Sequence, residues 1–366
     1  FPMQLPVIAL GVDTASLATG DRMRGRALAS IPIDKVVILY VGRLSPHDKM
    51  DLFPLLQAFA QVRRQAPEVD PVLLLAGSRQ GSPYVDMLTM WAQGLGIRDH
   101  VHFLADFDEE RKPDIYAAAD IFVSPCDNPQ ETFGLTVVEA MAAGLPVVVS
   151  DYDGYRETVP EAAGIRIPTY SVAPSAELSD LAPLDDRRSV HLRLGQGVAV
   201  DLAELTEALV TLSRNGSLRG KLGQAGTRHA RREYDWRVLI PRFEALWDGL
   251  AVEAAGARPA ANVQTNPLRL DYARTFDHYP TRKLAEDDLL AQTPLGRVFV
   301  QSGRYPLYAE MVSVLDLQHV RRLVEEAGEL RTVRELVDSL SATGVELERA
   351  RRSVLWALKH GLVEKG

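Results

Sequence analysis

Two glutamates near the middle of the chain, Glu131 and Glu139, bracket a Phe-Gly turn and are well placed to do chemistry. They follow the apolar run Ile121-Phe-Val-Ser-Pro125, so a strand gives way to a helix between them. A helix that begins near Gly134 points unpaired N–H groups and the positive end of its dipole at the preceding loop, which favours a phosphate group there. Carboxylates beside a phosphate need another partner, and sugar hydroxyls would supply one. The segment therefore predicts a site for a sugar attached to a phosphate.

A second loop offers the positive charge that such a site needs. Arg43 and Lys49 follow the apolar run 36–41, in a segment that opens with Gly42 and can turn tightly there. Arg can hold two phosphate oxygens with its planar fork, and Lys adds a compact charge. Because ligands of open parallel sheets bind at the carboxyl ends of the strands, both loops would share one edge. Alone, the two cations could equally be solvated loop charges; with the two glutamates they form complementary halves of one site.

Other polar residues of this edge have simpler explanations. The triplets Asp106-Phe-Asp108 and Asp151-Tyr-Asp153 would suit a divalent cation, but Asp is common at strand ends and helix caps. No His/Cys cluster has the spacing of metal ligands, so we expect no metal site. Cys126 is the single cysteine, and a lone thiol without an evident His partner is more often structural than nucleophilic.

The elements that position these residues alternate along the chain as in a parallel α/β sheet. The strands are continuous apolar runs, which is typical of strands that are buried on both faces. We therefore predict an α/β fold with a Rossmann-like parallel sheet. The expected strands are 36–41, 71–76, 101–104, 121–124, 146–150 and 164–168, and the expected helices between them are 51–64, 84–95 and 113–120.

The second half of the chain predicts a change of architecture. Residues 169–196 are rich in Pro, Ser and Asp and are expected to be irregular, and helices are expected at 201–214, 217–232 and 236–251. Small residues then predict a linker. The expected organisation is a Rossmann-like domain over 1–253, a linker over 254–270 and a smaller, mostly helical domain over 271–366.

The C-terminal domain contains two amphipathic helices, at 330–340 and 345–359, that resemble a winged-helix module with little or no wing. Arg349, Arg352 and Lys359 could form a basic face for DNA. However, residues 271–366 contain 14 Lys+Arg and 15 Asp+Glu, so the excess of positive charge typical of DNA binders is missing and we expect no nucleic acid partner. A packing role or a contact with a protein partner is the preferred interpretation. The aromatic and polar segment 276–282 could brace the structure or dock onto a partner.

Composition limits the class of protein. The chain has 366 residues, 46% of them hydrophobic, which is enough for two domains of about 100–200 residues each. A single cysteine excludes an internal disulfide framework and fits a reducing compartment. We find no apolar run of about 18 residues and no signal-peptide pattern, and expect a soluble, cytoplasmic protein. A net charge of −8 argues against broad binding to nucleic acid or acidic lipid.

Taken together, these motifs resemble the donor-binding half of a family 4, retaining, B-type (GT-B) glycosyltransferase. The resemblance rests on the two spaced glutamates, the Phe-Gly-Leu-Thr turn and the loop from Gly42 to Lys49, and it runs from about residue 6 to residue 250. It implies transfer of a sugar from a nucleotide-sugar with retention of configuration, in which the leaving phosphate accepts the acceptor's proton. Supporting segments are 8–13, 117–125, 139–147 and 153–159.

The resemblance also implies roles for single residues. Arg43 and Lys49 would bind the donor diphosphate, Glu131 would contact the transferred sugar, and Glu139 would bind the ribose hydroxyls. These cations and the helix N-terminus would supply the positive charge, so no metal or other cofactor is implied. Further donor-binding positions would be Gly42 and the backbone of Phe133, Gly134, Leu135 and Thr136.

Such enzymes place an acceptor domain and a donor domain across a cleft. The opening segment 8–13 resembles the crossover into the donor domain, so we expect this chain to be a fragment that lacks the N-terminal acceptor domain. The full-length protein could then be peripheral at a membrane. The nucleotide base, the sugar and the acceptor stay open. The alternative is a non-catalytic nucleotide-sugar-binding or regulatory module that works through its C-terminal helices, and an epimerase or phosphorylase on the same fold is a third hypothesis.

Overall fold

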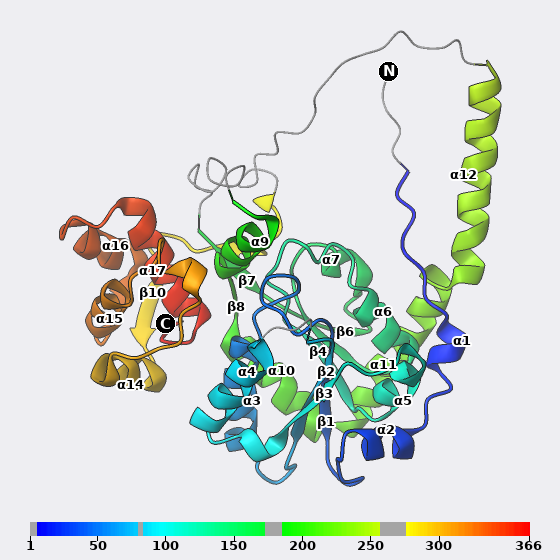
Figure 1. Ribbon diagram of the computed structural model, residues 1–366, viewed down its shortest axis with the longest axis horizontal. Helices are drawn as coiled ribbons and strands as arrows, with labels where there is room; N and C mark the ends of the chain where they lie inside the picture. Colours follow the sequence, from blue (N-terminus) through cyan, green and yellow to red (C-terminus); the bar gives the residue numbers. More distant parts are fainter. Residues whose placement is uncertain (1–5, 80–82, 173–184, 257–275) are drawn as a thin grey trace.

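The computed structural model describes residues 6–79, 83–172, 185–256 and 276–366. An α/β body occupies the centre of the view in Figure 1, with a smaller module of residues 289–366, here called the C-terminal module, on one side. Helix α12 (Trp236–Gly256) lies at the opposite side of the same view.

The body is built on one parallel sheet, as the sequence predicted. Its six strands are ordered β3-β2-β1-β4-β5-β6, so the chain builds outward from β1 in one direction and then returns to build outward from β4 in the other. The carboxyl ends of β1 and β4 therefore form the topological switch point of the sheet, where ligands of open α/β sheets bind. The strands are β1 Val37–Val41, β2 Val72–Gly77, β3 Val101–Ala105, β4 Ile121–Ser124, β5 Val147–Ser150 and β6 Gly164–Ile167.

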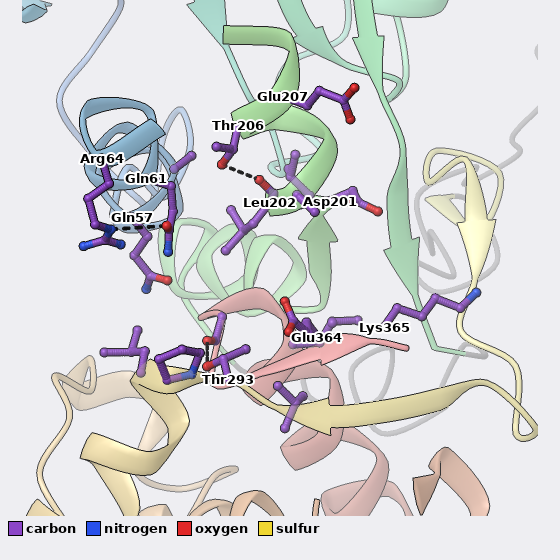
Figure 2. Close-up of a pocket in the computed structure, with 18 of the residues that line it drawn as sticks. Gln57, Gln61, Arg64, Asp201, Leu202, Thr206, Glu207, Thr293, Glu364 and Lys365 are labelled. Carbon is purple, nitrogen blue, oxygen red and sulfur yellow. Dashed lines mark hydrogen bonds between the residues drawn. The ribbon is translucent and has the colours of Figure 1, made fainter. Parts of the chain in front are cut away.

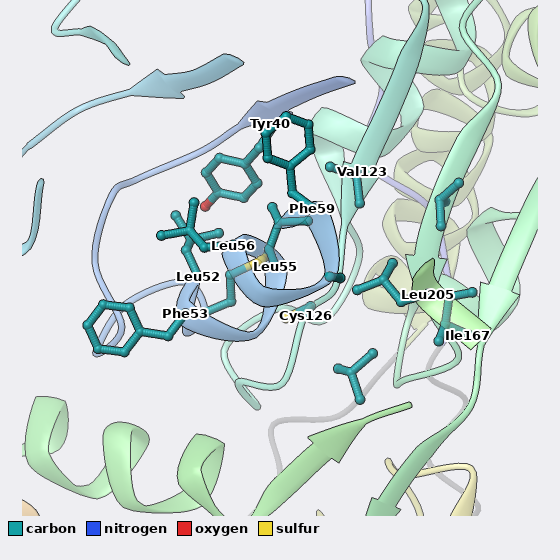
Figure 3. Packing of buried hydrophobic residues seen from close by; sticks show 14 of the residues in the cluster. Tyr40, Leu52, Phe53, Leu55, Leu56, Phe59, Val123, Cys126, Ile167 and Leu205 are labelled. Atoms are coloured by element: carbon teal, nitrogen blue, oxygen red, sulfur yellow. The ribbon is translucent and has the colours of Figure 1, made fainter. Parts of the chain in front are cut away.

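Helices cover both faces of this sheet and agree with the predicted ranges to within a few residues. In α3 the apolar side chains Leu55, Leu56 and Phe59 are fully buried and pack beneath β1 around Tyr40, as Figure 3 shows. The helices of the body are α1 Thr14–Leu17, α2 Arg22–Leu28, α3 Phe53–Gln65, α4 Tyr84–Gly94, α5 Lys112–Ala117, α6 Leu135–Ala142, α7 Tyr155–Thr158, α10 Leu202–Arg214, α11 Gly216–Glu233 and α12, with short 3₁₀ turns at Arg98–His100 and Glu109–Arg111.

The prediction that residues 169–196 are irregular is wrong on both sides of 173–184, which lie outside the described residues. Strand β7 (Thr169–Ser171) pairs with β8 (Val198–Val200) and with β9 (Arg282–Lys283). Helix α9 (Arg187–Gln196) begins where the Asp186 carboxylate accepts hydrogen bonds from two backbone N–H groups of its first turn. The strand was missed because it is only three residues long and both of its partners, β8 and β9, lie beyond the Pro- and Ser-rich stretch.

The C-terminal module packs four helices around a three-stranded antiparallel sheet ordered β11-β10-β12. The two predicted amphipathic helices are confirmed as α16 and α17. Helix α12 continues through Gly256 into the predicted linker 254–270, and residues 257–270 lie outside the described part of the chain, so the domain boundary stays a prediction. The elements are β10 Leu289–Gln292, α14 Pro294–Ser302, a 3₁₀ turn Ala309–Met311, α15 Leu317–Glu326, β11 Arg331–Thr332, α16 Val333–Ser341, α17 Leu347–Lys359 and β12 Val363–Lys365.

The segment 276–282 braces the body from within the chain. Arg156 donates hydrogen bonds to the carbonyl oxygens of His278 (3.0 Å) and Tyr279 (2.6 Å). The Tyr279 ring meets the Tyr152 ring edge-on, with 5.4 Å between centroids. Nowhere in the described residues is there a helix with the length and apolarity needed to cross a membrane.

Candidate active site

The loop after β1 approaches the sheet closely at Gly42. A Cβ atom at this position would lie 2.6 Å from the Tyr40 hydroxyl and 3.1 Å from Lys49 Cε, so any other residue would force one of these side chains to move. The Tyr40 hydroxyl donates a hydrogen bond to the Arg43 carbonyl oxygen at 3.0 Å, which holds the turn that follows. Gly42 therefore acts here by letting the loop fold back toward Lys49.

Two of the predicted site residues, Lys49 and Glu131, meet across the switch point as an ion pair. The pair is largely buried, and each side chain keeps about 11% of its surface exposed. Burial lowers the pKa of Lys49 to about 8. Its carboxylate partner also accepts a hydrogen bond from the Gly134 backbone N–H at 2.9 Å. One carboxylate thus connects the loop after β1 to the N-terminus of α6.

The Phe-Gly turn places the first N–H groups of α6 beside this pair. Gly134 is the N-cap residue and has a φ of 84°, which favours glycine, and a Cβ atom there would lie 2.3 Å from the Tyr155 ring. Phe133 turns its ring onto Tyr234, with 5.5 Å between centroids. The side chain of Leu135 is 37% exposed. The backbone of this turn therefore lies beside the ion pair, and the Phe133 side chain packs against Tyr234.

Arg43 lies against the loop that precedes Glu131. When the Gln130 amide is oriented to satisfy both of its neighbours, its oxygen accepts from Arg43 Nη2 and its nitrogen donates to the Asp48 carbonyl oxygen, each at 3.2 Å. The guanidinium is therefore held at the switch point, beside the Lys49–Glu131 pair that the same loops carry.

Glu139 lies one helical turn deeper and has partners that sequence reasoning missed. Lys112 donates to one carboxylate oxygen at 3.0 Å, and the Tyr116 hydroxyl donates to the other at 2.7 Å. Burial lowers the pKa of Lys112, but the Glu139 and Glu109 carboxylates outweigh this effect, so its pKa is raised and it stays charged. Both partners belong to α5, which follows β3 at the same sheet edge; a cation at the start of that helix was the signal available in the sequence.

The weaker candidates have structural roles. Burial raises the pKa of Cys126 to about 12, so its thiol is protonated at neutral pH and is not a nucleophile. The Asp151 carboxylate faces Arg166 at 3.3 Å, and the Asp106 carboxylate accepts from the Arg79 backbone N–H at 3.1 Å. Among the described residues, no group of three or more His, Cys, Asp or Glu side chains is arranged to hold a metal ion.

A cavity of about 820 Å³ lies elsewhere, between α3, α10 and the C-terminal module (Figure 2). Gln57, Thr206 and Thr293 are among the residues that line it. None of the predicted site residues does, so this cavity is separate from the edge of the sheet where Lys49 and Glu131 meet.

Residues 26–193 match the family model described as "Glycosyl transferases group 1", and this range includes every predicted site residue. Residues 26–193 are a glycosyl transferases group 1 domain. Its six-stranded sheet is the Rossmann-like layer of the GT-B glycosyltransferases. The family resemblance seen in the motifs is thereby confirmed.

The chain is also similar in sequence to known glycosyltransferases. The chain is 34% identical over 155 residues to a D-inositol 3-phosphate glycosyltransferase of Rhodococcus erythropolis (strain PR4), a match that covers 42% of this chain and 34% of that protein. It is 28% identical over 258 residues to a phosphatidyl-myo-inositol mannosyltransferase of Mycobacterium leprae, covering 69% and 58%. These matches therefore span only about a third to three-fifths of the relatives' own length.

Among solved structures, the sucrose-phosphate synthase of Thermosynechococcus elongatus is similar to this chain with a TM-score of 0.52 and 25% sequence identity. The match covers 68% of this chain and 53% of that chain. The similarity supports the same layered fold for the glycosyltransferase domain.

Proposed function

We propose that this chain binds the nucleotide-sugar donor of a glycosyltransferase that transfers a hexose with retention of configuration. The observation that carries the proposal is the meeting of Lys49, Glu131 and the N-terminus of α6 at the β1–β4 switch point. A cation, a carboxylate and the N–H groups of a helix N-terminus at one edge suit a sugar joined to a diphosphate.

The diphosphate would lie between the two loops. Departure of the nucleoside diphosphate builds negative charge on its outer phosphate, and fixed positive charge there stabilises the transition state. Arg43, Lys49 and the N–H groups of Leu135 and Thr136 would supply that charge. Because these groups supply it, we infer that the reaction requires no metal ion.

The two carboxylates would bind different parts of the donor. Glu131 lies next to the proposed phosphate position, so it would contact the transferred sugar. Glu139 is held by Lys112 and Tyr116, and each carboxylate oxygen can accept a second hydrogen bond. We assign those second positions to the ribose hydroxyls of the nucleotide.

The names of the relatives are consistent with hexose transfer, since they include a mannosyltransferase and several glycosyltransferases that act on inositol 3-phosphate. The acceptor would face the donor from a second domain, which is the arrangement implied by the family resemblance. The acceptor itself is left open in this proposal.

Titration calorimetry with UDP, GDP and ADP and with one hexose conjugate of each tests the proposal. We expect at least one diphosphate to bind, its sugar conjugate to bind more tightly, and Lys49→Met to weaken both. The control is Lys35→Met, which removes a cation paired with Asp70 near the amino-terminal end of β1. If none of the six ligands binds to the folded chain, the donor-site assignment is wrong; binding without transfer, when an acceptor domain is supplied, would favour the non-catalytic alternative.

A further inference from the structure

The C-terminal module contacts the two loops that carry the proposed donor site, at residues other than those of the site itself. The Tyr308 hydroxyl donates to Asp51 at 3.1 Å, and Glu310 faces His47 at 3.2 Å. Lys359, at the end of α17, pairs with Asp127 in the loop after β4. The module thus contacts the loop that presents Lys49 and the loop that presents Glu131.

The Lys359–Asp127 pair is the most deeply buried of these contacts, with 1% and 3% of the side chains exposed. Lys359 also donates to the carbonyl oxygens of Gly195 (2.9 Å) and Val198 (3.2 Å). An ammonium group has three N–H donors, so all of them are used. The cation is fixed in one position, and so is the carboxylate that it holds.

Asp127 transmits this position to Glu131 through a short turn. The Glu131 backbone N–H donates to the Asn128 carbonyl oxygen at 3.1 Å, and the Gln130 N–H donates to the Asn128 side chain at 3.0 Å. The Asn128 amide in turn donates to the carbonyl oxygens of Pro46 (3.3 Å) and His47 (3.1 Å). The turn therefore ties the two loops to each other.

Asp51 joins the same network from the other loop. Its backbone N–H donates to Asp127 at 3.3 Å, and its carboxylate accepts from Gln196 at 2.9 Å and from the Tyr84 hydroxyl at 3.2 Å. Gln196 also contacts the His360 ring, with 3.3 Å between Nε2 and Oε1. The body and the module share one buried polar network under the donor edge.

We propose that Lys359 is a positioning residue for the donor site: acting through Asp127, it fixes the turn that presents Glu131 to Lys49. The C-terminal module is then a built part of the donor-binding unit. The inference rests on the proposed function for the identity of the ligand, whereas the effect of Lys359 on the two loops can be measured without it.

The physical reason is the cost of an unpaired charge at Asp127. Without Lys359, this carboxylate would remain buried beside Asp51, another acid, and a buried charge without a partner is strongly unfavourable. Asp127 would relieve the cost by taking up a proton, since burial already raises its pKa to about 6, or by moving toward water. Either change loosens its hold on the turn, and Glu131 is only four residues further along. A misplacement of about 1 Å in a binding site can cost about a hundredfold in catalysis, so even a small movement would be felt at Glu131.

Hydrogen–deuterium exchange of the full chain tests the proposal, with Lys359→Met compared with Arg351→Met. Arg351 belongs to the same helix but pairs with Glu286 and Glu348 away from the donor loops. We expect Lys359→Met alone to accelerate exchange in segments 44–52 and 126–134, because the network that protects them opens. We also expect it to weaken binding of the sugar conjugate roughly tenfold, and to weaken binding of the bare diphosphate less, because Glu131 contacts the sugar.

Unchanged exchange in both segments of folded Lys359→Met would overturn the proposal, and so would equal acceleration in Arg351→Met, since that would indicate general loosening of the module. If Lys359→Met does not fold, Asp127→Asn breaks the same ion pair from its other member and leaves no unpaired carboxylate. It should accelerate exchange in segment 126–134, and an unchanged rate there would equally overturn the proposal. If the wild-type chain binds none of the six ligands, the proposed function fails, while the exchange comparison still decides the role of Lys359.

Discussion

The chain contains two lysine–carboxylate pairs of the same chemistry in opposite surroundings. Lys49 and Glu131 meet at the open edge of the sheet with about 11% of each side chain exposed. Lys359 and Asp127 meet beneath that edge with 1% and 3% exposed. The first pair lies where we propose that the donor binds, whereas the second is enclosed between the body and the C-terminal module.

The difference lies in how completely each cation is used. Lys359 gives its three donors to Asp127 and two carbonyl oxygens, so it cannot take another partner. Lys49, beside the N-terminus of α6, stands where a phosphate would add a second negative charge to its surroundings. A saturated pair holds loops in place, and a pair at an open edge can share its cation with a ligand. Breaking the Lys359–Asp127 pair should therefore mainly lower stability, and breaking the Lys49–Glu131 pair should mainly weaken ligand binding.

The largest expected effect is on stability. Lys359→Met should lower the free energy of unfolding by about 3–5 kcal/mol, because it leaves a buried carboxylate without a partner. Lys49→Met should lower it by less, because Glu131 keeps about 11% of its side chain exposed and keeps the Gly134 N–H as a partner. Urea unfolding of both variants measures the contrast.

The double variant Lys359→Met/Asp127→Leu serves as the control for this prediction. Replacing both members of a buried pair by apolar residues removes the unpaired charge, so the double variant should recover much of the stability that Lys359→Met loses. Equal losses in the Lys49 and Lys359 single variants would break the comparison between the two pairs.

The next effect concerns ligand binding, where the ranking should reverse. Lys49→Met should weaken binding of the preferred nucleoside diphosphate by about tenfold to a hundredfold, because a hydrogen bond to a charged group contributes about 1.5–3 kcal/mol. Lys359→Met should change binding of the bare diphosphate less. Calorimetry on both variants gives the ranking, and a stronger effect of Lys359→Met on the bare diphosphate would mean that Lys49 does not bind phosphate.

The buried region should also respond to acid through His360. Burial lowers the pKa of this ring to about 3, with Asp51 opposing and Lys359 assisting the shift. The unfolded chain takes up this proton below a pKa of about 6.5 but the folded chain does not until about 3, so stability is lost as the pH falls through this range. At pH 5 the loss should be about 2 kcal/mol, at 1.36 kcal/mol per pKa unit.

His360→Phe removes this dependence and keeps an aromatic ring beside Trp356. Urea unfolding at pH 7 and pH 5 should therefore show a smaller difference for the variant than for the wild type. Asp127, whose pKa burial raises to about 6, titrates in the opposite sense but is common to both proteins. An identical difference in the two proteins would show that His360 is charged or accessible in the folded state.

The sequence was sufficient for the sheet and for the meeting of the Lys49 and Glu131 loops, because both rest on local signals. Apolar runs marked the central strands of the parallel sheet, whereas β3 and β6 at its two edges contain His102 and Arg166. The order of elements placed the loops of Lys49 and Glu131 at one edge. The Phe-Gly turn marked the start of α6 because the conformation of Gly134 demands glycine. Each of these features is encoded within a few residues of where it acts.

What was missed depends on partners that are distant in the chain. Lys359 was considered only as part of a basic face, and nothing near it in sequence indicates Asp127, 232 residues away. Strand β7 was predicted to be irregular because both of its partners, β8 and β9, lie beyond the predicted irregular segment 169–196. Of the two partners of Glu139 on α5, Lys112 had a signal in its place at the start of the helix, whereas Tyr116 resembles an ordinary core aromatic until the fold brings it to a carboxylate. Polar pairs between residues far apart in the chain leave no periodic pattern in the sequence.

The smallest expected effect separates the two glutamates of the donor edge. Glu139→Ala should weaken binding of the bare diphosphate by about tenfold through loss of its contacts with the ribose, and Glu131→Ala should weaken it less. Glu109→Ala is the matched control, because it also removes a carboxylate from Lys112 but one whose side chain is 81% exposed.

Glu131→Ala should instead reduce the preference for the sugar conjugate over the bare diphosphate, because its carboxylate would contact the sugar. This ratio of dissociation constants is insensitive to a general loss of phosphate binding, since such a loss weakens both ligands equally. If Glu139→Ala changes the ratio and Glu131→Ala does not, the roles of the two carboxylates are exchanged. The Lys49–Glu131 pair would then contact only the nucleotide. It would differ from the Lys359–Asp127 pair in its exposure to solvent, but it would have no part in recognising the sugar.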